Sequence, residues 1–89
     1  MKKVGQNTDL KNEMNIGDVV RVLVNEEEQI LDRDPVTIIP VTMEGYVGET
    51  NGHYLHLTMH DPTKPIPGRF YDKKEYKGSV EEFEVLQRR

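Results

Sequence analysis

Three histidines lie close together in the sequence, and imidazole nitrogens are common ligands for metal ions. His53, His56 and His60 are followed directly by Asp61. On a helix the three imidazoles would share one face, but the segment alternates apolar and polar residues, which is typical of a strand. On a strand, His53 faces away from the other two, and His56 and His60 stand about 13 Å apart. We therefore expect neither a metal site nor a cofactor.

Residues suited to covalent catalysis are scarce. The chain has no cysteine, and its only serine is Ser79. With Glu82 three residues later, Ser79 fits a capping box that starts a short 3-10 turn, so the cap explains this serine. The 16 carboxylates show no spacing that singles out a general acid or base. We expect a protein that is not an enzyme.

Acidic residues concentrate in residues 26–34, where five carboxylates and one arginine give a charge of 1 − 5 = −4. Ile30 and Leu31 lie among them. Carboxylates around exposed apolar side chains form a docking surface for a basic protein, or imitate the phosphates of a nucleic acid. The alternative is a solvated loop whose Ile30 and Leu31 fold back on the core. The candidate partner-binding residues are Glu26, Glu27, Glu28, Ile30, Leu31, Asp32 and Asp34.

Basic and aromatic residues are mixed in residues 64–77, where five bases and two acids give a charge of 5 − 2 = +3. Cations that follow phosphates and rings that stack on bases suit single-stranded nucleic acid. The alternative is that Phe70 and Tyr71 belong to the core. The candidate nucleic-acid-binding residues are Lys64, Arg69, Phe70, Tyr71, Lys73, Lys74, Tyr76 and Lys77, to which Lys2, Lys3, Arg88 and Arg89 add charge.

The composition indicates that strands position these residues. The 89 residues suffice for one small domain. Valine, isoleucine and threonine number 10, 5 and 6, and alanine is absent. Branched residues of this kind favour strands, whereas alanine is the best helix former. We expect a mostly β domain over residues 16–89, preceded by a flexible arm over residues 1–15.

Alternating apolar residues predict the individual strands. Residues 19–24 form the first strand, with Val20, Val22 and Val24 on one face. Residues 36–49 form a long second strand, in which Pro40 requires an edge, a bulge or a bend and Gly45 marks a kink. Asn51-Gly52 favours a type I′ turn into a return strand over residues 53–60. Residues 83–86 form the closing strand. The inward-facing residues of the hairpin are Ile39, Val41, Met43, Val47, Leu55, Leu57 and Met59.

This layout resembles that of the small SH3-like barrels, of the KOW and Tudor types. The resemblance is carried by Gly17-Asp18-Val19-Val20, by the hairpin over residues 45–57 and by residues 79–86. It implies a small SH3-like barrel or β-roll of about five strands with one short 3-10 turn. Because such folds host many functions, the resemblance assigns no binding site.

The function we expect is non-enzymatic binding of a protein partner, typical of a small bacterial or phage regulator or inhibitor. The alternative is an RNA- or single-stranded-DNA-binding barrel that uses residues 64–77. No apolar run in the sequence has the roughly 18 residues of a membrane span. We expect a cytoplasmic protein, in which a free sheet edge offers a route to a homodimer.

Overall fold

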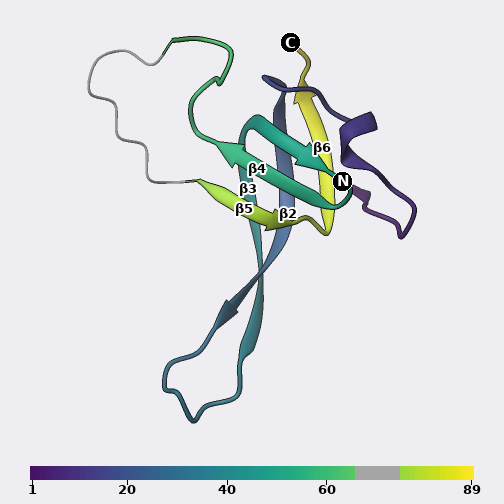
Figure 1. The fold of residues 1–89 in the computed structure, drawn as a ribbon. Helices are drawn as coiled ribbons and strands as arrows, with labels where there is room; N and C mark the ends of the chain where they lie inside the picture. The colour runs from purple at the N-terminus through teal and green to yellow at the C-terminus, as the bar shows by residue number, and fades with distance from the viewer. Residues whose placement is uncertain (66–74) are drawn as a thin grey trace.

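A single antiparallel sheet makes up most of the protein, in a computed structural model that describes residues 1–65 and 75–89 (Figure 1). The mostly β fold expected from the composition is confirmed. The strand order is β1-β6-β2-β3-β4-β5, and the sheet does not close among the described residues. The elements are β1 (Lys2–Lys3), η1 (a 3-10 helix, Leu10–Asn12), β2 (Val19–Glu28), β3 (Thr37–Asn51), β4 (Tyr54–Thr58), β5 (Tyr76–Ser79) and β6 (Glu82–Gln87).

The core lies on one face of the sheet, and the predicted alternation of β2 is confirmed. Val20, Val22 and Val24 are fully buried. On the neighbouring strands the inward positions of Val47, Leu55 and Leu57 are buried as well. Met59 was predicted to face inward, but β4 ends at Thr58 and 49% of Met59 is exposed. The buried apolar residues are Leu10, Met14, Val20, Val22, Val24, Val47, Leu55, Leu57, Val80 and Phe83.

The β3–β4 hairpin is confirmed, but its turn lies one residue later than predicted. Asn51 pairs with Tyr54, so the two loop residues are Gly52 and His53. Gly52 has a φ of +61°, and no described residue other than glycine has a positive φ. A type II′ turn needs a positive φ only at its first loop position, whereas type I′ needs two. Glycine therefore occupies the first loop position, and His53 belongs to the turn rather than to the return strand.

Two glycines shape the middle of β3. The pairing with β4 shifts by one residue between Val47 and Glu49, which identifies a β-bulge at Gly48. Gly45, where a kink was expected, has another role. A Cβ atom there would lie 2.6 Å from the carbonyl oxygen of Thr58, so only glycine allows the two strands to approach this closely.

The N-terminal residues pack on the sheet, whereas the sequence predicted a flexible arm over residues 1–15. Leu10 and Met14 are buried in the core, and β1 pairs with β6. The backbone N–H of Leu10 donates to the carbonyl oxygen of Gly52 at 2.8 Å. A side-chain oxygen of Asp9 accepts from the N–H of Gly52 at 2.9 Å and also caps η1. This segment therefore covers the turn of the β3–β4 hairpin.

The segment before the closing strand differs from the prediction. Ser79 does not cap a 3-10 turn but ends β5, a strand that the sequence analysis did not predict. The chain turns at Val80, whose side chain is buried, and β6 then follows as expected. The one 3-10 helix of the described residues is η1, near the N-terminus.

A buried carboxylate joins the start of β2 to the end of the chain. The side chain of Asp18 is fully buried and accepts from the backbone N–H groups of Asn15 at 2.8 Å and Arg89 at 2.9 Å. The Arg88 guanidinium lies 3.8 Å from the same carboxylate. These donors satisfy a charge that would otherwise be costly to bury. Within residues 1–65 and 75–89, no helix is long and apolar enough to cross a membrane.

Candidate functional site

A two-stranded ribbon extends from the sheet and carries the acidic segment (Figure 1). The pairing of β2 with β6 ends at Leu23, and β4 pairs with β3 only from Tyr46 onward. Between these limits, and among the residues that the structure describes, β2 and β3 pair only with each other, as far as Glu28 opposite Thr37. We call residues 25–40 the arm and the rest of the described chain the body. The arm contains no buried residue.

The three consecutive glutamates lie on a strand, whereas their sequence predicted a loop. Glu26, Glu27 and Glu28 continue β2, opposite Ile39, Ile38 and Thr37. Because side chains alternate along a strand, Glu26 and Glu28 lie on the face that is continuous with the core, and Glu27 lies on the other face. Carboxylates therefore occupy both faces of the arm. Asp32 and Asp34 lie in the loop that joins the two strands.

The loop at the tip of the arm is closed by its own hydrogen bonds. The Gln29 side-chain amide donates to the carbonyl oxygens of Asp32 at 3.3 Å and Asp34 at 2.8 Å. The N–H of Asp34 donates to the carbonyl oxygen of Leu31 at 2.9 Å. Ile30 is 82% exposed and Leu31 is 64% exposed, so neither folds back on the core.

Further exposed apolar side chains lie next to these two residues and were not among the predicted site residues. Ile38 is 62% exposed on the face that carries Glu27, and Ile39 is 37% exposed on the opposite face. Val36 is exposed at the end of the loop. The alternation placed Ile39 on the inward face, and it does continue that face. Ile39 nevertheless belongs to the arm, so it lies outside the buried core of the body.

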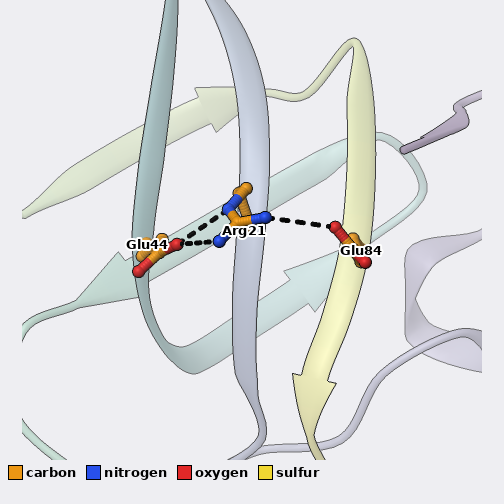
Figure 2. Close-up of polar contacts among 3 residues, drawn as sticks. All are labelled: Arg21, Glu44 and Glu84. Carbon is orange, nitrogen blue, oxygen red and sulfur yellow. Dashed lines mark hydrogen bonds and ion pairs between the residues drawn. The ribbon is translucent and has the colours of Figure 1, made fainter.

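An ion-pair network joins three strands at the base of the arm (Figure 2). Arg21 of β2 lies between Glu44 of β3 and Glu84 of β6, and each of the two glutamates is its direct cross-strand neighbour. The Arg21 Nε–H donates to Glu44 at 2.7 Å, and the distance to Glu84 is 3.4 Å. Exposed pairs of this kind contribute about 0.2–1 kcal/mol each. The network aligns the strands from which the arm departs.

The basic and aromatic segment is described only at its ends. Arg69, Phe70, Tyr71, Lys73 and Lys74 lie outside the described residues. The described members lie on different elements. Lys64 lines a hollow of about 240 Å³ together with Arg88 and Arg89, whereas Tyr76 and Lys77 belong to β5.

Tyr76 is held by the fold and is not a free stacking ring. Its ring packs against the core, and its hydroxyl donates to the carbonyl oxygen of Ser79 at 2.5 Å. Partial burial raises the pKa of the Tyr76 phenol, and the nearby carboxylates of Glu26 and Glu81 raise this pKa further. The carboxylates of Glu26 and Glu81 therefore lie close enough to Tyr76 to act on it electrostatically.

The three histidines occupy different local environments. His53 lies in the turn, His56 on β4, and His60 beyond the end of that strand. The His56 Nε2 atom lies 3.3 Å from a carboxylate oxygen of Glu75. Within the described ranges, no three histidine or carboxylate side chains are grouped as metal ligands would be.

Comparison with known proteins finds no matching family model, no matching curated protein and no matching solved structure.

Proposed function

We propose that the protein is a non-enzymatic binding module that docks on a basic protein partner through the arm, as a small regulator or inhibitor does. The observation that carries this proposal is the exposure of Ile30 and Leu31 among five carboxylates, on an element that adds nothing to the buried core. Large exposed apolar side chains gathered at one place mark interaction surfaces.

The two kinds of side chain have separate tasks in this proposal. Ile30 and Leu31 provide the buried contact, and full burial of each side chain contributes about 1.5–3 kcal/mol. The carboxylates attract a positively charged surface and raise the rate of association. Since they lie on both faces of the arm, they also resemble the charge distribution of a nucleic acid strand, so an enzyme that binds nucleic acid is one class of partner.

The layout of the body fits an SH3-like barrel. Strands β2, β3, β4 and β5 are consecutive neighbours in the sheet, and β6 returns to the other side of β2. Since folds of this type serve several functions, the assignment of protein binding rests on the arm.

The proposal is tested by affinity capture from a cell lysate with four versions of the full chain. The wild type should retain a specific protein that is lost with Glu26→Lys plus Glu27→Lys and with Ile30→Ser plus Leu31→Ser. Glu49→Lys is the matched control, because Glu49 is an exposed glutamate of the body. Equal capture by all variants would show that the arm is not the docking element.

A second candidate function, binding of single-stranded nucleic acid, is favoured by the hollow that Lys64, Arg88 and Arg89 share. Binding of a labelled single-stranded oligonucleotide should then fall steeply as the salt concentration rises. It should also be lost in the Lys64→Glu plus Arg89→Glu variant. Binding that these two changes leave intact would exclude this hollow as the site.

A further inference from the structure

The outer edge of β2 has no neighbouring strand along the arm. On the body, β6 covers this edge, and the pairing ends where Leu23 lies opposite Glu82. Strand β2 continues to Glu28. In the part of the chain that the structure describes, no strand pairs with residues 25–28 on this side.

The alternation of the backbone identifies which groups point to this open edge. The carbonyl oxygen of Leu23 accepts from the N–H of Glu81 at 2.8 Å, so the polar groups of Leu23 point toward the β6 side. Every second residue of an antiparallel strand directs its N–H and C=O to the same side. Asn25 and Glu27 therefore point their N–H and C=O groups to the open edge. Glu26 and Glu28 direct theirs to β3.

The opposite edge of the arm is blocked. Val47 exchanges backbone hydrogen bonds with Gly17 and Asp18, the two residues that precede β2, so the odd-numbered residues of β3 face β2. The residues that face away along the arm are thus Ile38 and Pro40. Proline has no N–H and interrupts any strand that would pair there, a common protection of sheet edges. The two edges of the arm therefore differ: only the β2 edge retains all its donors.

The side chains on the open edge select the chemistry of an added strand. A strand paired with β2 would place its side chains about 4.5–5.5 Å from those of Glu26, Glu27 and Glu28. Lysine or arginine at these positions would form cross-strand ion pairs on both faces. A second copy of this chain would instead place glutamate against glutamate, and like charges directly opposite one another are destabilising.

We propose that residues 25–28 of β2 receive an extended lysine- or arginine-rich segment of the protein partner by strand addition. This inference rests on the proposed function and names the form in which the basic partner binds. Backbone hydrogen bonds to Asn25 and Glu27 supply affinity, and the three glutamates supply selectivity. The apolar tip contacts the partner beyond the added strand.

The test uses a synthetic probe, the peptide acetyl-Lys-Thr-Lys-Lys-Lys-Thr-Lys-amide, and the full-length chain. Saturating peptide should slow amide hydrogen exchange at Asn25 and Glu27 and leave Ile38 unchanged. The control peptide has the same sequence with N-methyl groups on alternate residues, which keeps its charge and removes the donors needed for a ladder. It should bind about tenfold more weakly.

Two substitutions at one position separate the backbone from the charge. Glu27→Pro and Glu27→Thr both remove one carboxylate, but only proline removes the outward N–H. The β2–β3 hydrogen bonds remain in both variants, because Glu27 does not face β3. The proline variant should bind the probe about tenfold more weakly than the threonine variant. Persistent exchange protection at Glu26, which faces β3, shows that the arm is intact.

A third variant tests strand addition by adding a backbone donor instead of removing one. Pro40→Thr restores an N–H on the blocked edge, so the probe should then also slow exchange at Ile38. Equal binding of both peptides, together with equal binding by the two Glu27 variants, would overturn strand addition. Capture of a partner that depends on the arm would in that case still support the proposed function. Loss of that dependence would overturn both proposals.

Discussion

Single residues of this protein take their role from the strand that holds them. Tyr76 has the residue type and the basic neighbours of a base-stacking ring, but β5 turns it toward the core and binds its hydroxyl to Ser79. Ile39 is placed by alternation on the inward face, yet it is part of the arm. The residue type limits which contacts a side chain can make. Its position in the sheet determines whether the side chain packs on the core or stays exposed.

Replacement of Tyr76 by phenylalanine should make the stability less sensitive to alkaline pH. Burial and nearby carboxylates raise the pKa of this phenol above its ordinary value of about 10. The unfolded chain therefore loses the phenolic proton at a lower pH than the folded protein does. The protonated Tyr76 phenol therefore makes its full contribution to the free energy of unfolding below about pH 10. This contribution is lost as the pH rises through the pKa of the phenol in the folded protein.

The measurement is urea unfolding between neutral and alkaline pH, with tyrosinate absorbance recorded on the folded protein. Tyr76→Phe should lose less stability above about pH 10 than the wild type and should lack the latest phase of the absorbance titration. The matched control is Tyr54→Phe, in which that phase should persist. An unchanged late phase in Tyr76→Phe would show that another group produces it.

At the scale of elements, strands with regular alternation were predicted from the sequence and short elements were not. Val20, Val22 and Val24 identify β2 because three branched apolar residues repeat with a period of two. Strand β5 has only four residues and one half-buried ring, so its sequence contains no comparable pattern. The turn was misplaced by one residue because glycine satisfies either turn type, and the strand pairing decides between them.

The acidic segment of the candidate site also has some features that the sequence predicts and others that only strand pairing decides. The sequence alone shows the charge of this segment and its apolar residues. Its extension as a strand depends on the partner strand, because Glu26, Glu27 and Glu28 have little preference for strands. They are held extended by pairing with Ile39, Ile38 and Thr37, and only the three-dimensional register reveals this pairing.

The N-terminal segment should prove to be a structural element when Leu10 is changed to alanine. Leu10 is fully buried, and removal of a buried leucine side chain usually costs about 2–5 kcal/mol. Urea unfolding should report a loss in this range. The control Leu31→Ala removes the same atoms from the exposed tip and should change the stability by less than about 0.5 kcal/mol. A Leu10→Ala effect as small as that of the control would mean that residues 1–15 are a flexible segment that adds little to the stability.

At the scale of the whole molecule, charge and packing are separated in space. Residues 25–40 contain five acids and one base, a charge of 1 − 5 = −4, which equals the net charge of the entire chain. The remaining residues therefore sum to a net charge of zero. Within residues 1–65 and 75–89, every buried apolar side chain lies outside the arm. The arm therefore carries the acidic charge, whereas the buried apolar side chains of the described residues lie in the body.

This separation predicts that the body folds without the arm. Val24 and Val41 lie directly opposite each other in the β2–β3 pairing, so a two-residue Asn-Gly turn can join them in place of residues 25–40. All ten core residues are retained. Circular dichroism and urea unfolding should show a β-rich protein with one cooperative transition. Its net charge rises from −4 to −4 − (−4) = 0, so its solubility near neutral pH should be lower.

The shortened chain also isolates the source of binding. It should capture no arm-dependent partner and should leave the lysine-rich peptide unbound, while its exchange protection at Val22 and Leu55 remains. Transfer of residues 24–41 to a β-hairpin of an unrelated carrier protein is the reciprocal experiment, and it should carry peptide binding with it. A body that unfolds without the arm would show that the β2–β3 extension stabilises the sheet. Its exposed isoleucines and leucine would then need a structural explanation rather than a functional one.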